Sequence, residues 1–242
     1  MKNKDALYFE KQTSDTQFRF DKKVTEVFDD MIERSVPGYG ITISMLGIIA
    51  AKYSQADSYC YDLGCSLGAS TLAMRRNIKQ SGCSIVSVDN SEPMIEKCQE
   101  RIAANNSQVP VKLVCADIQD VSIRNASIVV LNFTLQFIAP EKREVLLKKI
   151  FDGMLPGGVL ILSEKISFED KKVEALNIEM HHTFKKAQGY SELEISRKRT
   201  ALENFLTSET VAIHRQRLKN AGFQTSTVWF QCFNFMSIAA VR

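Results

Sequence analysis

Apolar residues alternate between two spacings along the central part of the chain, and this alternation constrains the fold more than any other feature. Short runs rich in β-branched residues predict strands, and the segments between them carry apolar residues at helical spacing. Strands are expected at 58–64, 84–90, 111–118, 126–133 and 159–164, and helices at 69–78, 91–105 and 140–154, the last ended by a turn at 155–158. Strands separated by helices pair in parallel, which predicts an α/β fold with a doubly wound sheet.

Further elements are expected on both sides of this core. Two N-terminal helices are expected within 20–55, the first capped by Asp21. Near the C-terminus, a helix at 211–222 precedes two strand-like runs with no helix between them, so those runs should form an antiparallel hairpin. Residues 165–206 interrupt the alternation with a charge-rich helical insertion, in which Ser191 and Glu194 fit a capping box. We interpret this insertion as a lid, a dimer contact, or both.

Composition sets limits on the function. The 242 residues, 45% of them hydrophobic, suit a single domain spanning 1–242. The net charge of +3 makes no case for direct nucleic-acid binding, and no apolar run approaches the ~18 residues of a membrane span. The 6 cysteines form no CxxC pair, so we expect reduced thiols in a cytoplasmic protein. The adjacent histidines 181 and 182 lack metal-ligand spacing, and no metal is expected.

Candidate binding residues follow the predicted strands. Ligands of open α/β sheets bind beyond the carboxyl ends of the strands. A small-residue turn follows the first strand, Asp89 the second, Asp117 and Ile118 the third, and Asn132 the fourth. A carboxylate at the second strand can accept from both hydroxyls of a ribose, and an acid beside an aliphatic residue suits the amino group and a face of adenine.

Each of these residues also has an ordinary structural interpretation. A glycine-containing turn between strand and helix is common and by itself favours a ligand only about evenly. Asp62 can be a satisfied structural acid, and Asp89 can cap the following helix, although Ser91 is better placed for that role. The order of the four strand ends is what favours a nucleoside ligand.

The pattern Asp62-x-Gly64-x-Ser66-x-Gly68, followed by Asp89 and Asp117, resembles the class I S-adenosylmethionine-dependent methyltransferase fold. That resemblance implies a Rossmann-like seven-stranded sheet whose last strand is antiparallel. Ser66 stands where glycine is commoner, which is a mild departure because serine is also small.

A narrower resemblance covers nearly the whole chain from about Phe20. The runs SVPGY, YDLGCSLGAS, VDNS, LNFTLQF, LSEK, GYSELEISRKR and WFQCFNF are similar to those of the carboxy-S-adenosyl-L-methionine synthases. The resemblance implies conversion of S-adenosyl-L-methionine and prephenate to carboxy-S-adenosyl-L-methionine and phenylpyruvate. The product would supply the carboxymethyl group for 5-oxyacetic acid modification of wobble uridine in tRNA. It also implies a homodimer.

The resemblance places the family's ligand positions on ten residues, and no catalytic residue is assigned. These positions are Tyr39, Gly64, Cys65, Ser66, Asp89, Asn90, Asp117, Ile118, Asn132 and Arg199. Arg199 is the candidate for the new carboxylate, because a guanidinium can donate two parallel N–H···O bonds. Without the resemblance, an arginine in a charged helical insertion is more often part of a solvated surface.

Two other functions remain compatible with the sequence. An ordinary S-adenosylmethionine-dependent methyltransferase would share the turn and the two acids, but it would have no carboxylate for Arg199 to hold. A non-catalytic protein that binds S-adenosylmethionine is also possible, since no obligatory catalytic base is visible.

Overall fold

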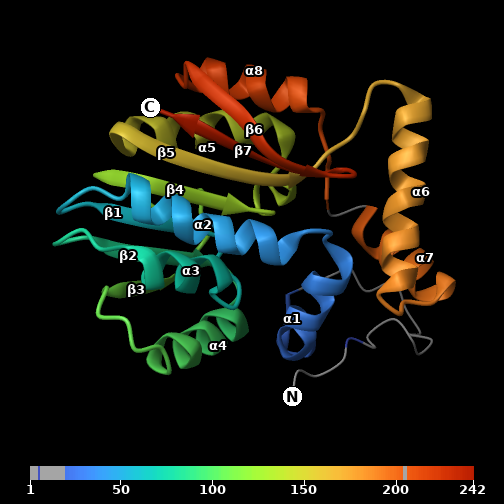
Figure 1. Cartoon of the computed structure of the whole chain (residues 1–242), viewed down its shortest axis with the longest axis horizontal. Helices are drawn as coiled ribbons and strands as arrows, with labels where there is room; N and C mark the ends of the chain where they lie inside the picture. The colour runs from blue at the N-terminus through green and yellow to red at the C-terminus, as the bar shows by residue number, and fades with distance from the viewer. Residues whose placement is uncertain (1–4, 6–19, 204–205) are drawn as a thin grey trace.

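A sheet of seven strands forms the centre of the molecule (Figure 1), in the order β3-β2-β1-β4-β5-β7-β6. The computed structural model describes residue 5 and residues 20–203 and 206–242, with the side chains of 198–203 outside the description. The strands are β1 (Tyr59–Leu63), β2 (Ser84–Asp89), β3 (Val111–Cys115), β4 (Ala126–Asn132), β5 (Met154–Lys165), β6 (Thr225–Cys232) and β7 (Phe235–Val241). The first five pair in parallel, and β7 runs antiparallel to both β5 and β6. This arrangement confirms the predicted fold class.

Helices cover both faces of the sheet. The helices are α1 (Lys22–Ser35), α2 (Tyr39–Tyr53), α3 (Ala69–Asn77), α4 (Glu92–Ala103), α5 (Pro140–Gly153), α6 (Lys171–Ala187), α7 (Glu192–Glu203) and α8 (Val211–Ala221), with a 3₁₀ turn η1 (Leu135–Phe137). Side chains of α2 and α3 pack on one face, and those of α5 and α8 pack on the other. The central strand β4 therefore buries both of its faces, which explains its unbroken apolar run.

Local sequence signals set the helix ends that position the site. The Asp21 side chain accepts from the Val24 amide at the start of α1, and the Ser91 hydroxyl accepts from the Met94 amide at the start of α4. The capping box before α7 has both of its bonds: the Glu194 amide donates to Ser191 Oγ, and the Ser191 amide donates to the Glu194 carboxylate. These three starts agree with the sequence expectation.

The turn expected at 155–158 is instead part of β5. Ala126 of β4 pairs with Met154, whereas Ile128 pairs with Val159, so the extra residues bulge out of the ladder. Gly157 takes a φ of 75° in this bulge, and its amide donates to the Arg242 carbonyl at 2.9 Å. The bulge thus keeps β5 in the sheet and holds the end of the chain against it.

The expected insertion contains α6 and α7, which stand beside α1 at one end of the sheet (Figure 1). Both ends of this segment are bonded to the residues that follow β4. The Lys165 amide donates to the Gln136 side chain, and the Thr207 amide donates to the Gln136 carbonyl. Arg143, which is fully buried, donates to the carbonyls of both Gln136 and Thr207. Within the described part of the chain, no helix is long and apolar enough to cross a bilayer.

Candidate functional site

The carboxyl ends of four parallel strands meet at one edge of the sheet. Leu63, the last residue of β1, pairs with Val88, so Gly64 lies beside Asp89. Asp89 pairs with Cys115 of β3, and Asp62 pairs with Val130 of β4. In Figure 1 the arrowhead of β4 points toward the side on which α1, α6 and α7 lie. The residues predicted from sequence to follow these strands therefore share one region.

The turn after β1 is shaped by Gly64. Its φ is 84°, in the left-handed region, and a Cβ there would lie 2.4 Å from Thr134 Oγ1. Thr134 belongs to the segment after β4, so a glycine is what lets these two strand ends approach. The amides of Gly64 and Cys65 both donate to the Val88 carbonyl, at 2.8 and 2.9 Å. The turn is thus fixed to β2 before any ligand binds.

Asp89 joins the turn after β1 to the start of α4. Its Oδ2 accepts from the Ser66 amide at 2.9 Å, and its Oδ1 accepts from the Ser91 amide at 2.9 Å. Burial raises the pKa of this carboxyl, while its bonds from backbone amides act in the opposite direction. Each carboxylate oxygen has a second lone pair, so the group can hold the turn and still accept from ribose hydroxyls. Asn90, the next residue, is exposed.

The end of β3 supplies a second acid. Asp117 is half-buried, and its Oδ1 accepts from the Gln119 amide at 2.8 Å. Its neighbour Ile118 is only 6% exposed and packs in the core cluster on the α5–α8 face of the sheet. Only a small part of the Ile118 side chain is therefore available to cover a ligand ring.

Buried acceptors without partners lie at the ends of β1 and β4. Asn132 Nδ2 donates to Ser70 Oγ at 3.4 Å, whereas Asn132 Oδ1 has no hydrogen-bond partner among the described residues. Asp62 accepts from Thr71 Oγ1 at 2.6 Å through one oxygen, and its Oδ1 likewise lacks a partner there. Burial raises the pKa of Asp62 to about 6. A buried acceptor without a partner costs free energy, so both atoms suit a ligand rich in donors.

Tyr39 reaches the same region from the first turn of α2. Its ring centroid lies 6.5 Å from that of Phe133, which follows Asn132 directly. Burial, with a smaller contribution from the Asp62 carboxylate, raises the pKa of Tyr39 well above its ordinary value. Phe133 itself has a φ of 60°, an uncommon conformation for a bulky residue and one that concentrates at functional sites.

β5 contributes a buried acid that the sequence did not single out. Glu164 is fully buried, and its Oε1 accepts from the Leu135 amide at 3.0 Å. Burial raises its pKa to about 8, so the carboxyl is mostly protonated near neutral pH. Thr134, Phe133 and Glu164 all lie in runs that carry the family resemblance, but nothing in their residue types or spacing marks them as neighbours of the site.

The structure thus gathers eight of the ten predicted positions at the strand ends. These are Gly64, Cys65, Ser66, Asp89, Asn90, Asp117, Ile118 and Asn132. Tyr39 lies beside Phe133, as described above. Arg199 belongs to α7, and its side chain is outside the described residues. The side-chain acceptors of Asp89, Asp117 and Asn132 match the donors of S-adenosylmethionine, namely the ribose hydroxyls, the adenine amino group and the amino-acid ammonium.

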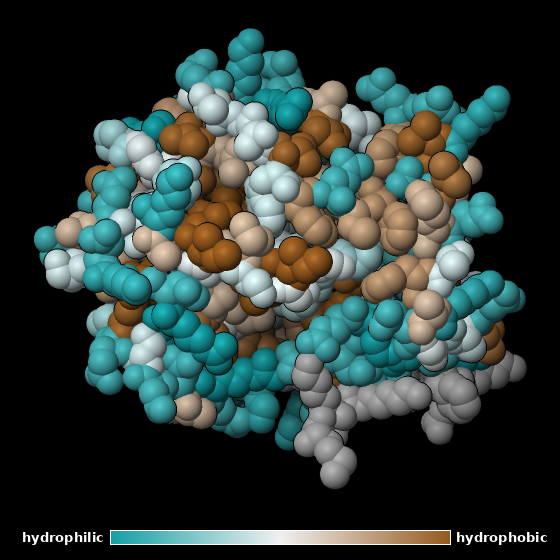
Figure 2. Space-filling model, viewed as in Figure 1, coloured by the Kyte–Doolittle hydropathy of each residue, from teal (hydrophilic) through white to brown (hydrophobic). Residues whose placement is uncertain are grey.

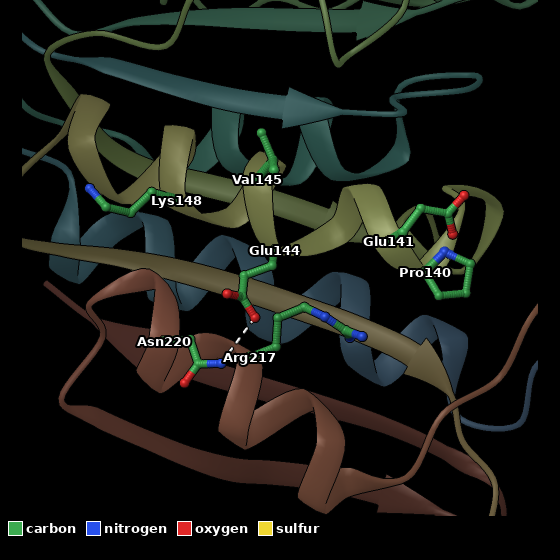
Figure 3. A pocket seen from close by; sticks show the side chains of 7 residues that line it. All are labelled: Pro140, Glu141, Glu144, Val145, Lys148, Arg217 and Asn220. Atoms are coloured by element: carbon green, nitrogen blue, oxygen red, sulfur yellow. Dashed lines mark hydrogen bonds between the residues drawn. The ribbon is translucent and has the colours of Figure 1, made fainter.

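A surface hollow of about 630 Å³ lies elsewhere, between α5 and α8 (Figure 3). Its lining residues are Pro140, Glu141, Glu144, Val145, Lys148, Arg217 and Asn220. The Asn220 side chain donates to Glu144 at 3.0 Å across it. None of the predicted binding residues lines this hollow, so it is separate from the candidate site.

Comparison with known folds agrees with this architecture. A model described as a methyltransferase domain matches residues 61–158, which include the end of β1 and the whole of β2, β3 and β4. A putative S-adenosyl-L-methionine-dependent methyltransferase from Methanococcus maripaludis superposes with a TM-score of 0.61 at 20% identity, over 96% of this chain and 97% of that one. An O-methyltransferase family protein from Burkholderia thailandensis superposes with a TM-score of 0.68 at 14% identity, over 92% and 60% of the two chains. These likenesses establish the fold alone.

Sequence relatives are much closer. A carboxy-S-adenosyl-L-methionine synthase from Citrifermentans bemidjiense is 60% identical over 226 residues, which cover 93% of each chain. Those from Trichlorobacter lovleyi and Erwinia tasmaniensis are 54% and 55% identical and cover the whole of this chain and 99% and 98% of their own. Identity at this level over full length confirms the family that the sequence motifs predicted. The chain therefore belongs to the carboxy-S-adenosyl-L-methionine synthase family.

Proposed function

We propose that this protein is an enzyme that converts S-adenosyl-L-methionine and prephenate to carboxy-S-adenosyl-L-methionine and phenylpyruvate. The observation that carries the proposal is the 60% identity to a carboxy-S-adenosyl-L-methionine synthase over 93% of the chain. The nucleoside-type acceptors gathered at the strand ends support it independently.

The reaction makes the sulfonium methyl carbon a nucleophile. The positive sulfur acidifies the methyl hydrogens, and loss of one proton leaves an ylide. Prephenate aromatises to phenylpyruvate and releases carbon dioxide and a hydroxide equivalent. The hydroxide takes the methyl proton to form water, and the ylide carbon bonds to the carbon dioxide, so atoms and charge balance. No protein base is then required, and the protein must hold the partners close and exclude water.

Each group of predicted binding residues is assigned one part of the ligand. Asp89 accepts from the ribose hydroxyls while its backbone partners hold it in place. Asp117 accepts from the adenine amino group, and Ile118 borders the ring. Asn132 Oδ1 and the turn of Gly64, Cys65 and Ser66 receive the amino-acid part. Arg199 pairs with the carboxylate that the reaction creates.

The assembly and cellular role complete the proposal. A homodimer is supported by exposed apolar side chains on α2, where Ile41 is 60% and Ile48 is 57% exposed. Brown surface gathers on this face in Figure 2, over the region in which α2 runs. The product would serve tRNA wobble-uridine modification by a separate enzyme in the cytoplasm, without direct binding of tRNA by this chain.

The test is a turnover assay with purified protein, S-adenosyl-L-methionine and prephenate. We expect phenylpyruvate and a nucleoside heavier by the mass of carbon dioxide, in equal amounts and beyond one equivalent per subunit. Mass spectrometry follows the nucleoside, and absorbance follows phenylpyruvate. S-adenosylhomocysteine as the product would indicate an ordinary methyltransferase instead, and binding without turnover would indicate a carrier.

A further inference from the structure

Arg34, in the last turn of α1, contacts the insertion. Arg34 is 8% exposed, and its Nε donates to the Gln188 carbonyl at 2.8 Å in the turn between α6 and α7. Its guanidinium carbon lies 3.9 Å from the centroid of the Tyr190 ring, which is a cation–π contact. Nη1 donates to Asp30 at 3.0 Å and to the Asp5 carbonyl at 3.2 Å. One side chain thus joins α1, residue 5 and the turn before α7.

The contacts of Tyr190 strengthen this junction. Its hydroxyl donates to the Asp5 carboxylate, and its ring is only 5% exposed. The capping box of Ser191 and Glu194 starts α7 immediately afterwards. Tyr190 directly precedes this cap, so its contacts with Arg34 and Asp5 fix where the start of α7 lies in space.

A second contact joins the same end of α1 to α6. His181 Nε2 lies 2.8 Å from the Ser35 carbonyl, and it must be the donor because a carbonyl can only accept. The His181 ring packs edge-on against Phe235 at 4.8 Å between centroids, and Phe235 packs against Phe133 at 6.0 Å. Phe133 in turn faces Tyr39 at 6.5 Å. A continuous set of rings therefore links the insertion to the candidate site.

Arg34 also lies close in sequence to the candidate site. The chain passes from α1 through Val36, Pro37 and Gly38 to Tyr39, and Val36 packs in the same small cluster as Phe133 and Phe235. A shift of α7 relative to this turn would move whatever α7 carries relative to the nucleoside. Arg199 belongs to α7, so the contact proposed between Arg199 and the new carboxylate requires that this helix be held in place.

We infer that Arg34 is a positioning residue, which fixes the start of α7 against the turn that carries Tyr39 and so aims Arg199 at the carboxylate of the product. This rests on the proposed function, in which Arg199 binds that carboxylate. Arg34 is not one of the ten predicted ligand positions, and in this inference it acts only through α7. Its loss should therefore affect the carboxylated ligand and leave S-adenosyl-L-methionine nearly untouched.

The test is Arg34→Gln, measured by calorimetry with both ligands and by steady-state kinetics. We expect the Kd of carboxy-S-adenosyl-L-methionine to rise about tenfold and kcat to fall about tenfold, with the KM of S-adenosyl-L-methionine changed less than about twofold. Arg34→Lys keeps the charge but loses the fork, and it should restore part of the loss. Tyr190→Leu removes the same contact from the other side, so it provides an independent variant if Arg34→Gln folds poorly.

Arg75→Gln is the matched control. Arg75, in the last turn of α3, also bridges two segments by donating to carbonyls, those of Val109 and Ile102, but it lies away from the insertion. It should change thermal stability without changing the ratio of the two ligand affinities. If Arg75→Gln lowers the preference for the carboxylated ligand as much as Arg34→Gln does, the effect comes from a general loosening of the fold, and the inference is overturned.

A double-mutant cycle separates this inference from the proposed function. If Arg34 acts through Arg199, adding Arg34→Gln to Arg199→Lys should cause no further loss of preference for the carboxylated ligand. Additive losses, or equal losses for both ligands, would overturn the positioning role while leaving the proposed function intact. If Arg199→Lys alone leaves the preference unchanged, the proposed role of Arg199 fails instead.

Discussion

Arg199→Lys is expected to weaken binding of carboxy-S-adenosyl-L-methionine about 30-fold or more, while S-adenosyl-L-methionine binds within about threefold of the wild-type affinity. A lysine keeps the charge but cannot donate two parallel bonds to one carboxylate. Losing one charge-assisted hydrogen bond costs about 1.5–3 kcal/mol, and about 1.4 kcal/mol is tenfold in Kd. Calorimetric titration of both ligands on the same preparation measures the difference.

Arg197→Lys provides the control for this change. It makes the same substitution in the same helix, and residues two apart on a helix do not share a face. We expect it to leave both affinities unchanged. If Arg199→Lys weakens both ligands equally, Arg199 contacts a part that the two molecules share, and the assignment to the carboxylate is wrong.

Asp89→Asn is expected to raise the Kd of S-adenosyl-L-methionine at least tenfold and to lower the free energy of unfolding by about 1–2 kcal/mol. The carboxylate accepts from the amides of both Ser66 and Ser91, whereas an asparagine side chain has only one acceptor oxygen. Its amino group would face one of the two donors, so the turn after β1 loosens, and the ribose hydroxyls lose an ionised acceptor.

Urea denaturation and ligand titration measure the two effects of Asp89→Asn separately. Asp120→Asn makes the same substitution at an exposed position near the end of β3 and should change neither quantity. If Asp89→Asn lowers stability but leaves the Kd unchanged, Asp89 serves the turn alone and does not contact ribose.

The core of the fold could be predicted because its signals are local. The strands β1, β2 and β4 are buried on both faces and are rich in apolar residues, and helix starts such as that of α4 carry their own caps. The bulge in β5 could not be predicted, because a Leu-Pro-Gly-Gly run has the composition of a turn. Its pairing with β4 and the end of the chain is a long-range property that no local pattern contains.

Some residues of the candidate site could likewise be predicted from the sequence, and others could not. The strand-end acids could be predicted, since parallel strands bring their carboxyl ends to one edge whatever their side chains. Thr134 and Phe133 could not, because their role depends on how closely the β4 end approaches Gly64 and Tyr39. Arg34 could not be predicted for a similar reason: an arginine at a helix end is common, and its partner in the insertion, Gln188, is 154 residues away in sequence.

The most direct measurement is to follow the ring carboxylate of prephenate through the reaction. Prephenate labelled with ¹³C at that carbon is incubated with S-adenosyl-L-methionine and the protein, and the products are separated and weighed by mass spectrometry. We expect the label in the nucleoside, on the carbon added to the sulfonium methyl group, with unlabelled phenylpyruvate beside it. Label recovered only as bicarbonate, with the nucleoside unchanged or converted to S-adenosylhomocysteine, would contradict the proposed carboxyl transfer.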